Sequence, residues 1–492
     1  MATFPIDQQE LAKRIESIYH HITLKVNHDV QEKYELKDEA LLCHSNLISY
    51  LALREQNLAG LQQQLMEIGL ADLTESHTHI LYTLEKIFFH LNSSPSSQTN
   101  VPIPTPQQSR EILKLRSKAL FGVEHPAIMV TVDSKILNEP CQLEELLLNG
   151  MNIVRINCAH DNREIWKRIH DLLRETEKRL RLEGKYQDTA CKIYMDLAGP
   201  KVRIGKLPTT PIYIQKGDNL RLYLTPANEG HPAMDNQPAG VPVTLEKAFR
   251  NVRINDSIFI DDGKIHGIVT DVTKAYIEIK IISSAAKQQR IKEGKGLNLP
   301  DSLLSLNLPA LTEKDLADLP FLSQHADMIG ISFVHSPLDL KKLREEIDIL
   351  NRAEIGVVAK IETKDAIHNL ARILLEGLSF KSFGIMLARG DLTVEVGPEN
   401  LSNVQDEILS ICSAAYTPVI WATGVLEKLT KKGIPSRAEI TDAAHGKRAN
   451  CIMLNKGAYL VDALKLLKKI LNTNETKTLR LIDLTSQFGV FK

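Results

Sequence analysis

The sequence predicts an α/β protein: a TIM-type (β/α)8 barrel with an inserted small all-β lid domain and an N-terminal all-α extension. Residues 1–92 show apolar positions at helical spacing and almost no strand pattern, which indicates helix after helix. Beyond residue 120, short apolar strands alternate with amphipathic helices, and eight such units are typical of a closed parallel barrel. Residues 205–297 interrupt this series with short alternating segments separated by turn residues, as expected of a small β domain.

The composition is that of an ordinary globular chain without a strong charge bias. Its 492 residues fit two to four domains, at roughly 100–200 residues per domain. The 60 basic and 61 acidic residues nearly cancel, so we expect neither nucleic acid nor a membrane as partner. No stretch approaches the roughly 18 apolar residues of a membrane span, and no secretory signal is evident. The six cysteines are scattered without metal-like spacing, which favours reduced thiols and a cytoplasmic location.

The helical extension and a linker come first along the chain. We predict helices over residues 11–26, 41–51, 58–65 and 80–91. A stretch rich in Ser and Pro follows, and it is not expected to pack. The helical extension carries no recognisable chemistry, so its expected role is docking or oligomerisation.

The barrel and the lid follow. We predict barrel strands over residues 127–132, 153–157, 192–196, 328–333, 356–361, 382–387, 418–421 and 451–454. We predict barrel helices over residues 143–148, 163–182, 313–319, 338–350, 365–375, 401–415, 438–444 and 458–471. The expected domains are therefore a helical region at 1–92, a linker at 93–120, a barrel at 121–204 and 298–475, a lid at 205–297 and a tail at 476–492.

Polar residues gather at the carboxyl ends of the predicted strands, where barrels of this kind carry their catalytic groups. They come from five strands: Arg155, Asn157, His160, Asp196, Lys360, Glu362, Arg389, Asp391 and Thr423. Taken singly, a basic residue could extend from a core strand to solvent, and an acidic one could cap a loop. Taken together they need partners for several buried charges, so we expect them to converge on one mouth of the barrel.

These residue types point to a metal and an anionic substrate. Glu362 and Asp391 can hold a hard divalent cation, Mg²⁺ or Mn²⁺ rather than zinc, because no His/Cys ligand set accompanies them. Residues 388–392, Ala-Arg-Gly-Asp-Leu, are expected to form a sharp turn whose backbone N–H groups bind a carboxylate. Arg155, Arg203 and Lys360 supply the positive charge that a phosphoryl group in transfer needs. The combination indicates phosphoryl transfer or enolate chemistry.

Residues 127–471 resemble the pyruvate kinase family along the barrel and the lid. The resemblance runs through GMNIVRIN at 150–157 with His160, MDLAGPKVR at 195–203, DDG at 261–263, KGLNLP at 295–300, KIE at 360–362, ARGDL at 388–392, AT at 422–423, SRAE at 436–439 and CIML at 451–454. Each motif is weak alone, but their order and spacing are specific. The resemblance implies transfer of the phosphoryl group of phosphoenolpyruvate to ADP, giving pyruvate and ATP.

The resemblance also implies a role for each site residue. Glu362 and Asp391 would bind the essential Mg²⁺, Lys360 would stabilise the phosphoryl group in flight, and Arg155 would contact phosphate. Thr423 would lie on the face where the enolate is protonated. The substrate would contact Ala388, Arg389, Gly390, Asp391 and Thr423, and the nucleotide would contact Arg155, His160, Arg203, Asp262 and Lys295. The lid would close and exclude water from the reaction.

The sequence departs from the family at the monovalent-cation region. Asn157 and Asp196 are retained, but Ala159 stands in the position of a Ser and Lys201 in the position of a Glu. An ammonium group at Lys201 can supply the charge that K⁺ supplies elsewhere in the family. We therefore expect that K⁺ is not required.

Three further departures concern other parts of the chain. Asp133 and Ser134 replace Gly-Pro beside the adenine site, Gly424 replaces a Gln, and Asn455-Lys456 replaces Ser-Gly-Glu after the last strand. About 20 residues follow the last barrel helix, so we expect no C-terminal regulatory domain, no sugar-phosphate activation and no tetramer of the usual kind. A homo-oligomer built through the N-terminal helices remains open.

Two other functions fit part of the pattern. A divergent sensor would bind phosphoenolpyruvate without efficient phosphoryl transfer, and the altered adenine edge favours it. A metal-dependent lyase or aldolase acting on pyruvate enolate would also place a Glu and an Asp on adjacent strands. Such barrels generally lack the lid, and this favours the kinase.

Overall fold

The computed structural model describes residues 7–31, 38–70, 73–124, 126–225, 228–234, 237–301 and 309–472. The chain divides into two compact units. The first comprises Met1–Leu120 and Met195–Val419, and the second comprises Phe121–Tyr194 and Ile420–Lys492. Within the described residues, none of the helices has the length and apolar character needed to cross a bilayer.

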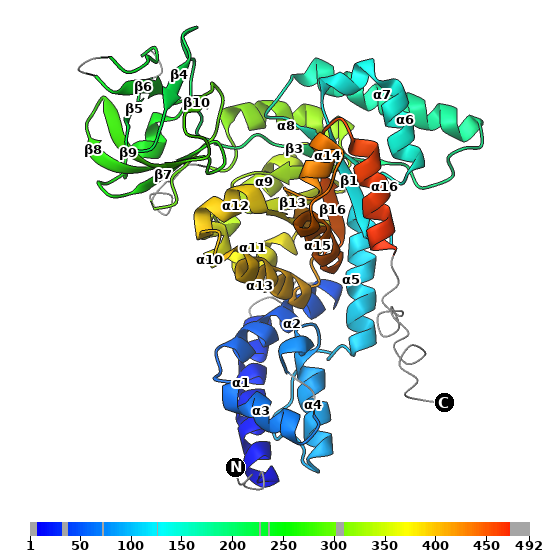
Figure 1. Ribbon diagram of the computed structural model, residues 1–492. Coiled ribbons are helices and arrows are strands. Elements are labelled where there is room, and N and C mark those ends of the chain that lie inside the picture. Colours follow the sequence, from blue (N-terminus) through cyan, green and yellow to red (C-terminus); the bar gives the residue numbers. More distant parts are fainter. Residues whose placement is uncertain are drawn as a thin grey trace, which may run out of the picture. The chain divides into compact units, whose positions relative to one another are not determined.

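The described residues contain a closed barrel of eight strands, which confirms the predicted fold class (Figure 1). The strands are β1 (Ala127–Val132), β2 (Ile153–Asn157), β3 (Lys192–Asp196), β12 (Met328–Ile331), β13 (Gly356–Ile361), β14 (Phe383–Ala388), β15 (Val419–Ala422) and β16 (Cys451–Leu454). Their order around the barrel is β1-β16-β15-β14-β13-β12-β3-β2. Strands β1, β13 and β14 are buried along their whole length, which explains their continuous apolar sequences.

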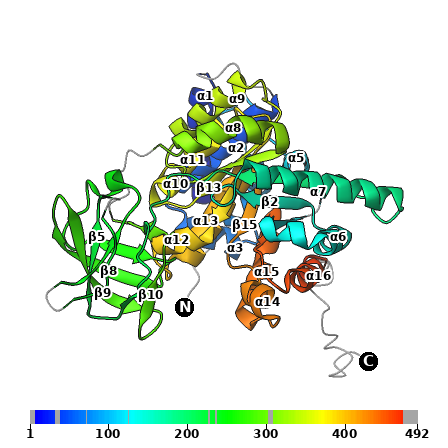
Figure 2. The same ribbon diagram turned by 90° about the horizontal axis from the view of Figure 1, so that it is seen from above.

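Amphipathic helices alternate with the barrel strands. They are α6 (Pro140–Leu148), α7 (Arg163–Leu182), α8 (Glu313–His325), α9 (Pro337–Ile349), α10 (Lys364–His368), α11 (Leu370–Gly377), α12 (Arg389–Val396), α13 (Leu401–Ala414), α14 (Glu427–Lys432), α15 (Arg437–His445) and α16 (Leu460–Leu471). Helix α7 shows why they form: Asn162 caps its N-terminus, and Trp166, Ile169 and Leu173 share its buried face. In the second unit α6 lies beside α7 (Figure 2).

Several predicted elements have other bounds in the structure, such as the helix expected over 313–319, which continues as α8 to His325, and two of the differences have a clear local cause. The strand expected over 328–333 ends at Ile331, because Phe333 has a φ of 55° and its N–H donates to the Glu362 carboxylate, 2.8 Å away. The helix expected over 365–375 is two helices, α10 and α11, that meet at Asn369. The Asn369 side chain donates to the Asp365 carbonyl, 3.1 Å away, and to a carbonyl outside the helix, a competition that interrupts helices.

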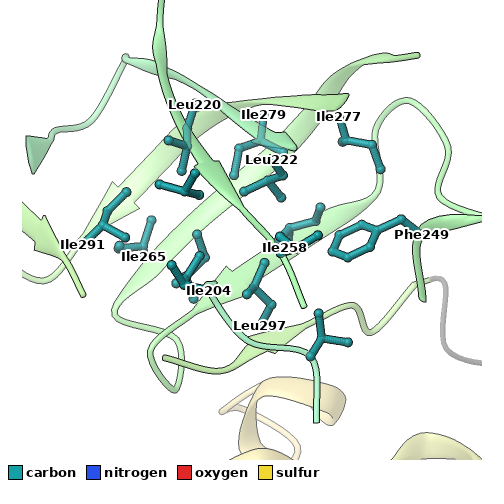
Figure 3. Packing of buried hydrophobic residues seen from close by; sticks show 14 of the residues in the cluster. Ile204, Leu220, Leu222, Phe249, Ile258, Ile265, Ile277, Ile279, Ile291 and Leu297 are labelled. Carbon is teal, nitrogen blue, oxygen red and sulfur yellow. The ribbon is translucent and has the colours of Figure 1, made fainter. Parts of the chain in front are cut away.

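The lid lies between β3 and β12 in the sequence and has its own apolar core. Its strands are β4 (Ile212–Ile214), β5 (Asn219–Tyr223), β6 (Ala239–Pro242), β7 (Ser257–Ile260), β8 (Ile265–Val272), β9 (Tyr276–Ser284), β10 (Gln289–Ile291) and β11 (Leu297–Asn298). Six of them pair in the order β11-β7-β8-β9-β5-β6, and β10 pairs with β4. Ile258, Ile277 and Ile279 are buried among other Ile, Leu and Val side chains (Figure 3), so the lid can hold its shape by itself.

The N-terminal extension is helical, as predicted. It contains α1 (Gln8–Gln31), α2 (Asp38–Arg54), α3 (Ala59–Glu67) and α4 (Ile80–His90) (Figure 1). Tyr19 of α1 packs edge-on against Phe88 of α4, with 5.7 Å between ring centroids. Helix α2 also contacts α13, where the Asn46 amide donates to the Ala414 carbonyl, 2.8 Å away.

Much of the predicted linker is a helix. Residues 106–120, assigned to the linker at 93–120, form nearly all of α5 (Pro106–Phe121). Thr105 and Gln108 exchange side-chain and backbone hydrogen bonds of 2.9 and 3.3 Å, a capping box that starts the helix. Proline is tolerated in the first turn, so the Pro-rich composition that indicated a linker instead precedes and opens a helix.

Candidate active site

Lys360 is the centre of a buried charged cluster in the first unit. It lies on β13, and only 9% of the residue is exposed. Its Nζ lies 2.9 Å from Glu362 Oε1 and 3.4 Å from Asp196 Oδ2, and it donates to Ser332 Oγ at 2.8 Å. Strands β3 and β13 thus bring together an ammonium and two carboxylates that the sequence predicted to converge. A buried charge needs such partners, and here each has one.

Glu362 is held at both carboxylate oxygens. Oε1 faces Lys360, and Oε2 accepts a hydrogen bond from the Phe333 N–H at 2.8 Å. Phe333 adopts a left-handed conformation that is rare for a bulky residue, and this turn aims its N–H at the carboxylate. At 2% exposure the Glu362 carboxylate has little freedom to move.

Asp391 accepts two hydrogen bonds at one oxygen. Lys201 Nζ lies 2.7 Å and Asn298 Nδ2 lies 3.2 Å from Asp391 Oδ1. Burial by itself would raise the pKa of this carboxyl. The charge and hydrogen bond of Lys201, the bond from Asn298 and the charge of Lys360 outweigh burial and hold the pKa of Asp391 below its usual range. The carboxylate is therefore ionised at neutral pH.

The segment 388–392 is a helix start rather than a sharp turn. Helix α12 begins at Arg389, so Asp391 lies in its first turn. The preceding residue, Ala388, has no side chain that could cap the first N–H groups. A helix N-terminus has the property for which the turn was predicted, because its first N–H groups also attract an anion. The small residues Ala388 and Gly390 indicated that a ligand could come close to the backbone, but they did not indicate whether that backbone is a turn or a helix.

Three predicted site residues of the second unit lie on β2 or just after it. Arg155 is buried on β2, and its Nη1 donates to Thr131 Oγ1 at 3.1 Å. Asn157 follows at the end of β2, and its side-chain oxygen accepts a hydrogen bond from the Ala159 N–H at 3.0 Å. His160 comes after this turn, and its backbone carbonyl accepts from an indole N–H at 3.0 Å. Strand β2 thus carries one buried guanidinium and ends in a hydrogen-bonded turn.

Thr423 has the most unusual backbone among the predicted site residues. It directly follows β15 with a φ of 68°, and Gly424 follows with a φ of 83°. A β-branched residue is strained in the left-handed region, and such strain persists at functional sites more than elsewhere.

Arg203, which lies just before the lid, and Lys295 of the lid were predicted to reach nucleotide, and both already contact lid residues. Arg203 Nη1 donates to the Gly294 carbonyl at 2.8 Å. Lys295 Nζ lies 2.8 Å from Asp261 Oδ1. Asp262, predicted to lie near the nucleotide-bound metal, is exposed and adopts a φ of 55° beside Asp261. The structure pairs Lys295 with the first acidic residue of this turn rather than the second.

A cavity of about 570 Å³ in the second unit lies at the ends of β1 and β16. Its lining residues are Thr131, Val132, Asp133, Lys135, Ile136, Glu139, Gln142, Lys431, Lys456, Gly457, Ala458 and Leu460. Lys456 Nζ lies 2.7 Å from Asp133 Oδ2. Two departures from the family noted in the sequence, at Asp133 and Lys456, are therefore partners in one ion pair.

Sequence reasoning missed three residues that support the cluster. Ser332 receives the Lys360 hydrogen bond, and Asn298 contacts Asp391. Asp315 accepts hydrogen bonds from Ala198 N at 3.0 Å and Gly199 N at 3.2 Å, which fixes the chain where it leaves β3 for the lid. Only Asp315 had a local signal, since it forms a capping box with Thr312.

Glu362 and Asp391 carry the donor type that a magnesium ion prefers. No cluster of three or more His, Cys, Asp or Glu side chains suited to a metal occurs in the described ranges. Mg²⁺ is bound in proteins through one or two carboxylates together with substrate oxygens and water. Glu362 and Asp391 are two such carboxylates, and Asp391 is kept ionised by its neighbours.

Comparison with known proteins identifies relatives of this chain. The family model described as pyruvate kinase, barrel domain, matches residues 124–463. Pyruvate kinases of Staphylococcus aureus strains USA300, NCTC 8325 and COL are each 32% identical to this chain over 337 residues, which is 67% of this chain and 53% of each relative. The chain spans about half the length of the curated relatives it matches. The order of the barrel strands, the inserted lid and these matches show that the chain belongs to the pyruvate kinase family.

Proposed function

We propose that this protein is a pyruvate kinase that uses Mg²⁺, transfers the phosphoryl group of phosphoenolpyruvate to ADP, and needs no K⁺. The observation that carries the proposal is the buried cluster in which Lys360 contacts Glu362 and Asp196. This cluster supplies a fixed positive charge beside carboxylates that suit a divalent cation. Membership of the family supports the choice of substrates.

In the proposed reaction, Glu362 and Asp391 hold the cation, which neutralises negative charge on the substrate oxygens when bound. The bond between phosphorus and the enol oxygen breaks, and a bond to a terminal oxygen of ADP forms. Lys360 compensates the charge on the phosphoryl group as it moves, and Arg155 binds its oxygens. The enolate that remains takes up one proton at its methylene carbon to give pyruvate, on the side of Thr423.

The first turn of α12 suits the substrate carboxylate. The N-cap residue of this helix, Ala388, makes no side-chain cap hydrogen bond. The partial positive charge of a helix N-terminus favours an anion in that position. Arg203 and Lys295 would exchange their present partners in the lid for the phosphates of ADP.

Lys201 supports the proposal that K⁺ is not needed. Its ammonium lies 2.7 Å from Asp391, so the protein provides a monovalent positive charge next to an expected metal ligand. Asn157 and Asp196, the other residues of the predicted monovalent-cation region, would then serve the fold and the charge balance around Lys360.

A sensor that binds phosphoenolpyruvate without efficient transfer is the second candidate. It is favoured by the ion pair between Asp133 and Lys456, which lines the cavity beside the expected nucleotide base. The retained Lys360, Glu362, Asp391 and Thr423 favour the kinase instead.

The test is pyruvate formation by the full chain from phosphoenolpyruvate, ADP and Mg²⁺, in parallel with KCl and with tetramethylammonium chloride at equal ionic strength. We expect equal rates in both salts and no pyruvate without ADP. A strict K⁺ requirement would refute the role of Lys201. Bound phosphoenolpyruvate with no pyruvate in either salt would favour the sensor, and turnover of a pyruvate-derived substrate without ADP would favour a lyase.

A further inference from the structure

The two chain segments that join the lid to the barrel run side by side as one ribbon. The Ile204 N–H donates to the Lys295 carbonyl at 2.8 Å, and the Leu297 N–H donates to the Val202 carbonyl at 2.9 Å. An antiparallel bridge between Arg203 and Gly296 lies between these bonds. We call this hydrogen-bonded pair of segments the hinge ribbon.

Each hinge segment sends one side chain to the same atom of the barrel. Lys201 comes from the segment that enters the lid, and Asn298 comes from the segment that leaves it. Both donate to Asp391 Oδ1, at 2.7 and 3.2 Å. In the part of the chain that the structure describes, no hydrogen bond to Asp391 Oδ2 occurs, so one carboxylate oxygen is fixed and the other is unengaged.

A buried asparagine at position 298 destabilises the fold unless its amide makes a useful hydrogen bond. The residue is 4% exposed, and the bond to Asp391 is the only hydrogen bond of its side chain to a described residue. Its Oδ1 is buried without a donor among those residues. A buried acceptor without a partner destabilises the fold, and an apolar side chain of similar volume would avoid that penalty. The feature that an apolar side chain could not provide is the hydrogen bond to the Asp391 carboxylate.

We propose that Asn298 and Lys201 are positioning residues that fix Asp391 through Oδ1, so that Oδ2 is presented to the divalent cation and cation affinity depends on the position of the lid. The inference rests on the proposed function, which assigns Asp391 to the cation. The proposed role of Asn298 and Lys201 is to orient the Asp391 carboxylate, since neither residue touches the reacting atoms. Because coupling between two equilibria is reciprocal, cation binding also stabilises the hinge ribbon.

The test measures Mn²⁺ binding, not turnover. The dissociation constant of the full chain for Mn²⁺ is measured by electron paramagnetic resonance of the free ion, for wild type, Asn298→Leu and Lys201→Met. We expect Asn298→Leu to weaken binding by about tenfold, as expected for one hydrogen bond to a charged group. Hydrogen exchange at Ile204 and Leu297 should slow when Mn²⁺ binds to wild type, and this slowing should be lost in Asn298→Leu.

The matched control is Asn219→Leu, which removes a 2.9 Å amide bond to Glu278 within the lid sheet, away from the hinge. It should leave Mn²⁺ affinity within twofold, and thermal melting checks that all variants are folded. Unchanged Mn²⁺ affinity in Asn298→Leu would overturn the inference. Tighter binding in Lys201→Met would also overturn it, since Lys201 would then only repel the cation. Wild type that binds no Mn²⁺ would instead overturn the proposed metal site.

Discussion

Lys360 Nζ lies 2.9 Å from Glu362 Oε1, although the two residues are only two positions apart at the end of one strand. Glu362 directly follows β13, and alternate residues of an extended chain point to the same side, so the ammonium and the carboxylate lie on one side of the chain. Glu362 uses its second oxygen to hold the Phe333 turn, and Lys360 uses further contacts to reach β3. One pair thus links three segments that end at the site.

Lys360→Met should abolish phosphoryl transfer. We expect pyruvate formation to fall at least about 100-fold, since a group that stabilises transition-state charge contributes on that scale. The variant also leaves Glu362 and Asp196 without their shared cation, so stability should fall by about 3–5 kcal/mol in urea unfolding. Lys167→Met is the control, because it removes an exposed pair with Asp171 and should change neither quantity by much. Activity within a few fold of wild type would refute the role of Lys360.

The barrel core could be predicted from the sequence because its signal is local. The strand over 356–361 is apolar except for Lys360, and its bounds agree with those of β13. The Lys-x-Glu at its end also indicated a site, because burying charged groups is unfavourable unless they have partners or a function. Ser332 gave no such signal, because it lies within an apolar run and its partner is 28 residues away. Asn298 was likewise hidden, 93 residues from Asp391.

The elements that the sequence did not predict are short or begin in unusual composition. Helix α5 opens with Pro106 after a Ser- and Pro-rich stretch, so composition argued against a helix that capping then forms. Helices α12 and α14 have eight and six residues, too few for a helical period to emerge. Their existence depends on the strands that precede them and on Gly397 and Gly433, whose positive φ ends each helix.

Glu395 should make stability decline as the pH rises. Only 2% of this residue is exposed, and burial raises the pKa of its carboxyl to about 8, with Asp391 and Asp365 adding to the rise and Lys364 opposing it. An unfolded Glu titrates near 4.5, so between these pH values the folded state binds more protons. The free energy of unfolding should therefore fall through this window, by up to about 1.4 kcal/mol per pH unit.

Glu395→Gln tests this expectation, since a neutral amide can still accept from the Lys364 N–H. The variant should be as stable as wild type near pH 5 and more stable near pH 9, in urea titrations at both values. Glu399→Gln is the control, because Glu399 is exposed and lies three residues after the end of α12. Equal pH dependence in Glu395→Gln and wild type would show that the folded carboxyl is not protonated.

Asp133→Ala should affect nucleotide use and spare phosphoenolpyruvate. Its carboxylate pairs with Lys456 in the cavity of about 570 Å³ where the proposed function places the base. We expect the KM for ADP to change by about three- to tenfold and the KM for phosphoenolpyruvate to stay within twofold, in steady-state assays. Asp188→Ala, an exposed change in the same unit, should alter neither. A change confined to the phosphoenolpyruvate KM would move the nucleotide away from this cavity.

Asn46→Ala should loosen the helical extension from the barrel without changing the chemistry. The buried Asn46 amide donates to the His77 carbonyl at 2.9 Å and to the Ala414 carbonyl at 2.8 Å, so it joins α2 to the end of α13. Removing it leaves two carbonyls without this donor, at a cost of about 1–3 kcal/mol. Urea unfolding should show that loss, while Asn400→Ala, which removes an exposed bond to the Val396 carbonyl, should show little. Turnover should stay within twofold of wild type, because the contact lies at the opposite end of α13 from α12. A loss of activity as large as the loss of stability would mean that the extension also shapes the site.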